Sequence, residues 1–456
     1  MKKHKLLALL LSLALLVGVL AACGGGAGSS APAAEPESTP AADTPSSAPA
    51  ADAGALPYEG VTLSLLKDGD SADAGIEAVI ALAEEKLGMV VEIEYRVSGS
   101  DGDNLVKTRL ASGEMSDLLM YNCGSLLAAL NPAEYFIDLS GQPFADTIDD
   151  TFRDAASVDG ALYGVPFTSS SAGAVVYNKA IYEELELEVP HTWDDFLTNC
   201  ETIEAAGYDA MIGSFADAWT SQVVFLGDNY NIIAAEPDFA AEFEAGAAKY
   251  ATTPVGLQSF QKMVDLHPYY NEDYLATTFD DACDKLAMGE GAHWIMLTQV
   301  LTTINELYPE AIDDMGVFGV PGDDAADHGL TVWMPSAIYG NKDAENQDAI
   351  IAFLEFYVST EALDAYAATS SAEGPYLVKG YELGDTAPLA VREDMQAFFD
   401  AGKTITALEF MTAVKGPNCD AICQEAGSGQ TTAEQAAAAY DEDCKKQALQ
   451  LGLNWE

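Results

Sequence analysis

The feature that most constrains the fold is an alternation of strand and helix patterns. Residues 61–66 (VTLSLL) and 89–97 (MVVEIEYRV) read as strands. Between them, residues 76–87 place apolar side chains at i, i+3, i+4 and i+7, the period of an amphipathic helix. A second helix over 103–112 and a short buried strand over 117–121 follow. Because a β-α-β-α-β order requires right-handed crossovers, we predict an α/β fold with a parallel sheet covered by helices on both faces.

This topology also predicts where a ligand binds. In open α/β sheets, ligands lie outside the carboxyl ends of the strands, at the point where the strand order reverses. If the first strand is central, in the order 2-1-3, the turns that line this point carry Asp68 and the pair Tyr121 and Asn122. An aromatic face beside an amide that both donates and accepts hydrogen bonds suits a sugar, although a capped strand end is the alternative interpretation. Neither turn has a GxGxxG or GK[ST] element, so we do not expect nucleotide phosphate there.

The sequence predicts no metal site and no cofactor. Asp68, Asp70 and Asp73 form an acidic turn, but Asp73 stands where an EF-hand loop needs glycine, and a solvated turn is the simpler interpretation. The five histidines are scattered, with no HExxH motif and no closely spaced Cys/His quartet.

Composition narrows the class of protein. The 456 residues include 73 Asp or Glu and only 20 Lys or Arg, which gives a formal net charge of -53. With 49% hydrophobic residues the chain can build a core, and its length favours two or more domains. Such an acidic surface repels phosphate backbones, so nucleic acid is excluded as a partner.

The first residues predict export and a lipid anchor. Basic residues at positions 2, 3 and 5 precede an apolar run from Leu6 to Ala22, as in a signal peptide over residues 1–22. The following Leu20-Ala-Ala-Cys23-Gly resembles the lipobox of bacterial lipoproteins, in which the cysteine carries a diacylglyceryl group. Cys23 is therefore the predicted lipidation site and mature N-terminus, on the extracellular face of the cell membrane. An uncleaved transmembrane anchor is the alternative.

Residues 24–55 contain no large apolar side chain, so we interpret 23–55 as a lipidated N-terminus and flexible linker. Six further cysteines permit disulfides in an exported chain, but free buried thiols are an equally good interpretation.

Several motifs occur in a familiar order. They are Asn104 to Asp117 (NLVKTRLASGEMSD), Asp159 to Pro166 (DGALYGVP), Val176 to Lys179 (VYNK), Pro190 to Phe196 (PHTWDDF), Met288 to Trp294 (MGEGAHW) and Phe318 to Gly322 (FGVPG). Over about residues 60–456, their order and spacing resemble family 1 extracellular solute-binding proteins of ABC importers.

The resemblance implies two discontinuous α/β lobes joined by a multi-strand hinge, the periplasmic-binding-protein or Venus-flytrap type. Residues 57–168 and 337–373 would form lobe 1, and residues 169–336 and 374–456 lobe 2. The chain would cross between lobes near Pro166 to Ser171, Thr331 to Ser336 and Glu373 to Tyr376. By the same resemblance the protein is a monomer and not an enzyme, and it delivers a solute to ABC permease transmembrane subunits.

Aromatic residues indicate the class of solute. Trp219 stands at a strand-to-helix turn, Trp294 in a segment that faces the cleft by resemblance, and Trp333 in a predicted hinge crossing. Core packing explains each tryptophan singly, but together with Tyr121 they place aromatic rings on several sides of one cleft. We therefore predict a sugar or oligosaccharide ligand. The side chains expected to bind its hydroxyls are Asp68, Asn122, Ser171 and Asp217.

Other functions remain open at this point. A binding protein for a peptide, a polyamine or a metal chelate fits the same fold. An exported carbohydrate-active enzyme would need paired carboxylates. Among 73 acidic residues some pairs always look suggestive, so such pairs carry little weight.

Overall fold

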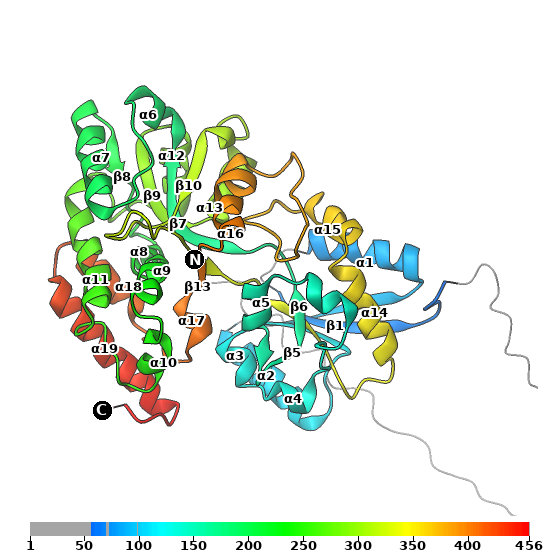
Figure 1. Ribbon diagram of the computed structural model, residues 1–456. Helices are drawn as coiled ribbons and strands as arrows, with labels where there is room; N and C mark the ends of the chain where they lie inside the picture. Colours follow the sequence, from blue (N-terminus) through cyan, green and yellow to red (C-terminus); the bar gives the residue numbers. More distant parts are fainter. Residues whose placement is uncertain (1–55, 70–72, 98, 456) are drawn as a thin grey trace, which may run out of the picture. The chain divides into compact units, whose positions relative to one another are not determined.

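The computed structural model describes residues 56–69, 73–97 and 99–455. Within these ranges the strands form two main sheets and a short hairpin, with helices around them (Figure 1). Sheet 1 has the strand order β2-β1-β3-β12-β6. Its strands are β1 (Thr62–Asp68), β2 (Val90–Arg96), β3 (Leu118–Tyr121), β6 (Gly164–Pro166) and β12 (Ala337–Gly340).

The predicted order 2-1-3 is confirmed, because β1 lies between β2 and β3 and is parallel to both. The predicted parallel arrangement of these three strands is confirmed as well, whereas β12, for which the sequence analysis predicted no direction, is antiparallel to β3 and to β6. A parallel neighbour needs a long crossover that returns the chain to the same end of the sheet. The chain instead enters β12 directly from sheet 2, so β12 runs in the opposite direction.

Sheet 2 has the order β13-β11-β7-β9-β8, and β10 also pairs with β7. Its strands are β7 (Ser171–Asn178), β8 (Asp209–Met211), β9 (Gly291–Leu297), β10 (Met315–Phe318), β11 (Leu330–Trp333) and β13 (Thr404–Thr406). The first half of β7 pairs with β11 and the second half with β10, while β9 lies on its other side. The hairpin consists of β4 (Ser157–Val158) and β5 (Ala161–Leu162).

The helices before β7 are α1 (Ala74–Leu87), α2 (Gly99–Ser112), α3 (Ser125–Ala128), α4 (Pro132–Tyr135), η1 (Pro143–Thr147) and α5 (Asp150–Ala155). Those between β7 and β12 are α6 (Lys179–Glu184), α7 (Trp193–Ala206), η2 (Ala218–Gln222), α8 (Val223–Gly227), α9 (Asn229–Ala235), α10 (Phe239–Glu244), α11 (Pro254–Leu266), η3 (His267–Tyr269), α12 (Phe279–Ala287), α13 (Gln299–Leu307) and η4 (Ile312–Asp314). After β12 come α14 (Gln347–Tyr357), α15 (Thr360–Ala367), η5 (Ala390–Met395), α16 (Gln396–Asp400), α17 (Leu408–Met411), α18 (Cys419–Gly427) and α19 (Ala433–Gln450).

Local sequence fixes several of these helix ends. Gly88 ends α1 with a φ of 82°, a left-handed conformation that favours glycine. The Thr278 hydroxyl accepts a hydrogen bond from the backbone N–H of Asp281, and the Asp281 carboxylate accepts one from the backbone N–H of Thr278. This capping box starts α12. Thr432 and Gln435 form the same arrangement at the start of α19.

Two segments, residues 167–170 and 334–336, lead directly from one sheet to the other, and residues 372–376 lie beside the first of them. They are hydrogen-bonded to one another. The backbone N–H of Phe167 donates to the carbonyl of Ser336 (2.8 Å), and that of Ser170 donates to the carbonyl of Pro375 (2.9 Å). The fold therefore has two α/β lobes joined by a multi-strand hinge, as the sequence predicts.

Segments far apart in the sequence complete each lobe. α14 and α15, from the last third of the described chain, lie beside α1 (Figure 1). The contact with α15 is close, because a Cβ on Gly75 would lie 2.5 Å from the ring of Tyr366. Two clusters of buried apolar side chains result. One extends from sheet 1 through the hinge to sheet 2 with helices α12 and α13, and the other lies between sheet 2 and helices α7, α11, α18 and α19.

The six cysteines within the described ranges are all buried and free, so the structure favours thiols over disulfides. Among the described residues no helix combines the length and the apolar character needed to cross a bilayer. The predicted signal peptide, Cys23 and the linker lie outside these residues.

Candidate ligand-binding site

The carboxyl ends of β1 and β3 carry three of the predicted site residues. Asp68 and Tyr121 are the last residues of their strands, and Asn122 follows directly. Asp68 and Asn122 are half-buried, and the Asn122 carbonyl accepts a hydrogen bond from the Tyr339 hydroxyl (3.0 Å). Because β1 and β3 are parallel, these ends lie on the same edge of sheet 1.

Tyr121 does not present the open aromatic face that the sequence suggests. Its side chain is 0% exposed, and the Arg96 guanidinium lies over the ring, 5.4 Å from the centroid. Burial, followed by the nearby Asp103 carboxylate, raises the pKa of the Tyr121 hydroxyl. The expectation that a sugar stacks on this ring is therefore wrong for the structure described here, because Arg96 occupies the face.

The acidic turn after β1 is partly neutralised by a lysine. Lys67 is fully buried, and its Nζ donates to the Asp73 carboxylate (2.7 Å) and the Asp68 carbonyl (2.8 Å). The hydrogen bond from Lys67 lowers the pKa of Asp73. Asp73 thus pairs with Lys67 and with the Tyr95 hydroxyl (2.9 Å), and it makes no side-chain cap on α1. Asp70 lies outside the described residues, and among those described no cluster of three or more His, Cys, Asp or Glu could hold a metal ion.

On sheet 2, Ser171 and Trp333 lie opposite each other at the hinge end of β7 and β11. The Ser171 hydroxyl is 3.2 Å from the Thr298 hydroxyl. Trp333 is half-buried, and its ring rests on Gly173, where a Cβ would lie 2.6 Å from a ring carbon. A side chain at position 173 would therefore displace the indole.

Glu409, which the sequence analysis did not single out, fixes the other edge of this indole. The Trp333 Nε1–H donates to the Glu409 carboxylate (2.5 Å), which also pairs with Lys415. The backbone carbonyl of Glu409 accepts from the Ser125 hydroxyl (3.3 Å), three residues after Asn122. Through α17, the structure therefore brings the Asn122 loop of lobe 1 close to Trp333.

Asp217 and Trp219 form a second group at η2. The Trp219 ring is 36% exposed and stacks on Phe279, with ring centroids 5.8 Å apart. The Asp217 carboxylate accepts a hydrogen bond from the Phe279 backbone N–H (2.7 Å) at the start of α12. Asp217 therefore fixes the backbone of the residue on which Trp219 stacks, while about a third of Trp219 stays exposed.

Trp294 is a core residue. It lies within β9, is 2% exposed, and packs against Phe279 with ring centroids 5.3 Å apart. Trp294 belongs to the buried apolar cluster that also contains residues of α12 and α13, such as Leu286 and Val300, so its ring is part of the core. The expectation that Trp294 contacts a ligand is not supported by this burial.

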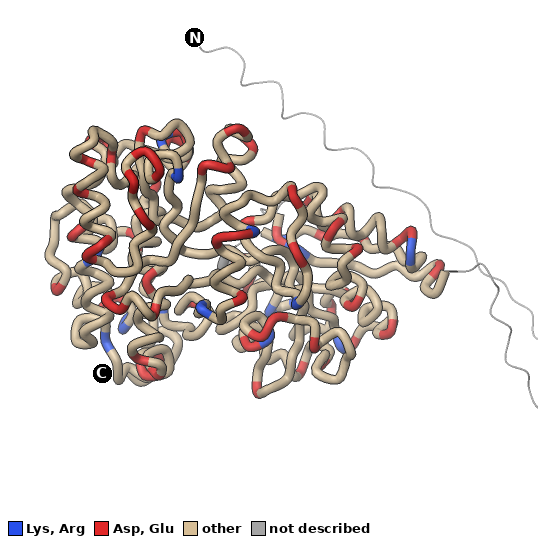
Figure 2. The backbone as a smooth tube through the Cα atoms, turned by 45° about the horizontal axis from the view of Figure 1, so that its top comes forward, with Lys and Arg blue, Asp and Glu red and all other residues tan. Residues whose placement is uncertain are grey.

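Charge does not mark out a site. Asp and Glu are distributed over the whole described backbone, with few Lys and Arg among them (Figure 2). Such a distribution favours solubility rather than one cation-binding surface.

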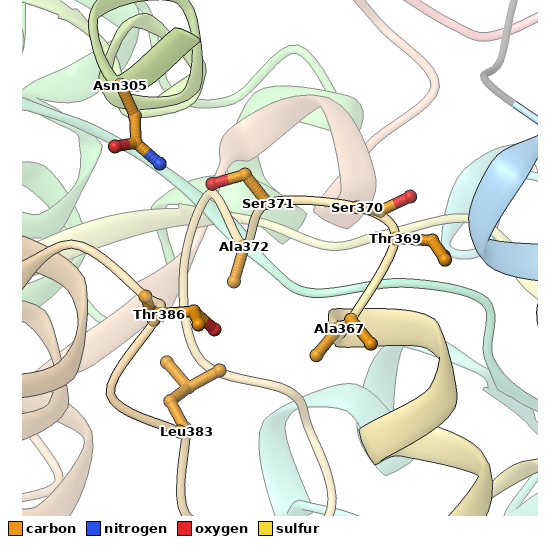
Figure 3. A pocket seen from close by; sticks show the side chains of 11 residues that line it. Asn305, Ala367, Thr369, Ser370, Ser371, Ala372, Leu383 and Thr386 are labelled. Carbon is orange, nitrogen blue, oxygen red and sulfur yellow. The ribbon is translucent and has the colours of Figure 1, made fainter. Parts of the chain in front are cut away.

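Two cavities lie away from the residues predicted from sequence. One, of about 180 Å³, is enclosed by Asn305 of α13, the segment 367–372 after α15, and the loop 383–387. Figure 3 shows the Asn305 amide and the Ser371 hydroxyl turned toward each other across it. The other, of about 400 Å³, is lined mainly by aromatic and small side chains, including Phe318 and Phe398.

The two lobes, joined by a hinge with polar and aromatic side chains beside it, are typical of a binding protein. The chain belongs to the family of bacterial extracellular solute-binding proteins, whose sequence profile matches residues 64–364. This membership confirms the resemblance noted from the motifs. The family consists of binding proteins, so the prediction that the chain is not an enzyme is also confirmed.

Similar proteins include the multiple sugar-binding protein of Streptococcus mutans, 26% identical over 35% of this chain and 38% of its own length. The melibiose/raffinose/stachyose-binding protein MelE of Bacillus subtilis is 24% identical over 33% of this chain and 38% of its own length. The chain thus spans well under two thirds of either relative. The solved apo structure of RafE from Streptococcus pneumoniae covers 85% of this chain and 99% of its own, with 20% identity and a TM-score of 0.68.

Proposed function

We propose that the protein captures a carbohydrate between its lobes and delivers it to the transmembrane subunits of an ABC importer. One observation carries the proposal: Trp333 stands at the hinge with its indole N–H held by Glu409 and its ring supported by Gly173. An indole fixed at both edges is a rigid platform. The C–H face of a sugar ring packs well on such a surface.

Stacking and hydrogen bonding at these residues can supply much of the binding free energy of a micromolar ligand. Stacking one sugar ring on an indole removes about 40–80 Å² of apolar surface, worth about 1–2 kcal/mol. Trp219 offers a second exposed ring, and Asp68, Asn122 and Ser171 supply polar groups for hydroxyls. Two such platforms with paired hydroxyls contribute a useful part of the roughly 8 kcal/mol of a micromolar affinity.

The named ligands of the relatives support the same class of solute, since both curated relatives are described as sugar-binding. A peptide, polyamine or metal chelate remains the alternative. The described residues show no metal-binding cluster, and the acidic residues are dispersed over the described backbone (Figure 2).

A thermal-shift screen tests the proposal. We expect at least one saccharide from a panel of neutral and acidic mono- and oligosaccharides to raise the melting temperature, because binding to the folded state at about 100 times Kd adds about 2.7 kcal/mol. A tripeptide mixture, spermidine and ferric citrate serve as controls. A shift with one of these controls, and none with any saccharide, would contradict a carbohydrate ligand.

We also propose the lobe boundaries given by the resemblance, namely 57–168 with 337–373 and 169–336 with 374–456. Sheet membership supports them. Every strand of sheet 1 falls in the first pair of ranges and every strand of sheet 2 in the second.

We further propose that Cys23 carries the lipid that holds the protein at the extracellular face of the membrane. In Cys23→Ala cells, the protein should move from the membrane fraction to the medium or the soluble fraction, because two acyl chains provide the anchor. Fractionation followed by immunoblotting measures this. If Cys23→Ala protein stays with the membrane, the apolar run 6–22 is an uncleaved anchor instead.

A further inference from the structure

Arg96 is a buried cation without a carboxylate partner. It is the last residue of β2 and 8% exposed. Its Nε is enclosed and makes no hydrogen bond, and its Nη1 makes one long bond to the Val97 carbonyl (3.3 Å). None of the ion pairs found within the described ranges includes Arg96.

An arginine that is not paired with a carboxylate is unusual for this chain, which has four arginines and 73 acidic residues. The other three arginines each pair with a carboxylate: Arg109 with Glu94 (2.7 Å), Arg153 with Asp146 (3.1 Å) and Arg392 with Asp385 (2.9 Å). Those three are more exposed than Arg96. A buried charge without a partner destabilises a fold, so the one arginine that most needs a carboxylate lacks it.

A second unsatisfied group lies directly beneath Arg96. The Tyr121 hydroxyl is buried and makes no hydrogen bond. Asp103 is near enough to raise the pKa of Tyr121, but its carboxylate makes no hydrogen bond of acceptable geometry with the hydroxyl. Two buried donors without acceptors, one stacked on the other, call for an explanation beyond packing.

Both donors lie at the edge of sheet 1 where the ligand is expected. Arg96 is paired in register with Asp68, and its carbonyl accepts from the Gly69 N–H (3.0 Å). The first turn of α2 closes over the arginine so tightly that a Cβ on Gly102 would lie 2.8 Å from Nη1. The surrounding chain therefore holds the guanidinium in place.

Lys67 and Asp73 neutralise each other (2.7 Å). Asp103 lies nearby as a half-buried acid, and the ion pairs among the described residues include none between Asp103 and Arg96.

We propose that Arg96 and Tyr121 form a subsite that binds a carboxylate of the solute, so that the protein selects an acidic sugar over its neutral counterpart. The proposal rests on the proposed function and adds the chemical class of the sugar. A guanidinium binds a carboxylate through two parallel hydrogen bonds, and the phenol supplies a third donor.

The first test needs no ligand. If Arg96 and Tyr121 are kept for binding at the expense of stability, Arg96→Met and Tyr121→Phe should each raise the melting temperature of the unliganded protein, by about 1–3 °C. Arg109→Met, which breaks an existing pair with Glu94, is the matched control and should lower it or leave it unchanged. A fall in the melting temperature of Arg96→Met would assign the arginine a structural role and overturn the proposal.

The second test compares D-galacturonate with D-galactose by calorimetric titration. We expect the wild type to bind galacturonate about 10- to 100-fold more tightly, and Arg96→Met to lose that preference while Arg109→Met keeps it. Equal binding of both sugars by the wild type would overturn the subsite but leave the carbohydrate function standing. If neither binds and no saccharide of the wider panel does, the proposed function itself fails, and the subsite with it.

Discussion

Replacing Lys262 with methionine is expected to destabilise the protein by about 3–5 kcal/mol, because it leaves a buried carboxylate without its cation. Lys262 of α11 and Asp228 are both about fully buried, and their charged atoms are 2.5 Å apart. The lysine also donates to the Pro321 carbonyl (2.6 Å). Asp228 accepts further bonds from Asn231 (2.7 Å) and Ser259. The network ties α9 and α11 to the loop after β10.

Urea unfolding followed by far-UV circular dichroism measures this change. Lys379→Met is the matched control, because Lys379 and Asp150 form an exposed pair (2.6 Å) that we expect to contribute about 0–1 kcal/mol. Lys262→Met combined with Asp228→Leu should recover part of the loss, since no unpaired charge then remains. Equal urea unfolding midpoints for Lys262→Met and Lys379→Met would show that the buried ion pair contributes no more to the free energy of unfolding than a surface pair.

Replacing Trp333 with alanine is expected to weaken ligand binding by about 30-fold or more. The variant loses the stacking surface, and tryptophan side chains at the centre of an interface commonly contribute about 2 kcal/mol or more. Trp333→Phe keeps an aromatic face but loses the bond to Glu409, so its affinity should fall between those of the wild type and Trp333→Ala.

The affinity of each variant is measured by calorimetry with the saccharide that gives the largest thermal shift. Trp455→Phe is the control. That indole is also buried and hydrogen-bonded, to the Phe243 carbonyl (2.7 Å), but it lies at the carboxyl terminus against α10. We expect its loss to lower stability and leave affinity unchanged. A folded Trp333→Ala protein with wild-type affinity would remove Trp333 from the site.

Much of the fold could be predicted because its signals are local. The alternating strand and helix patterns predicted the parallel β-α-β-α-β unit that the structure has, and the family motifs predicted an α/β fold with two lobes. The direction of β12 was not predictable from residues 337–340, since a four-residue apolar strand carries no mark of its orientation. Only the crossing from sheet 2 decides it.

The site was harder to predict because burial depends on neighbours distant in sequence. Tyr121 and Trp294 looked available, yet Arg96 covers the ring of Tyr121 and the apolar core buries the ring of Trp294. Glu409 was overlooked because one acid among 73 carries no signal of its own. Its importance comes from the fold, which brings residues 333 and 409 together.

The late position of β12 has a consequence for biogenesis. Sheet 1 cannot close until residues 337–340 are available, although β6 ends at residue 166. At typical synthesis rates of about 5–20 residues per second, the intervening 170 residues (337 minus 166, less one) take about 10–30 seconds to be made. During that interval the nascent amino-terminal third exposes unpaired strand edges, so it depends on chaperones or on prompt passage across the membrane to avoid aggregation.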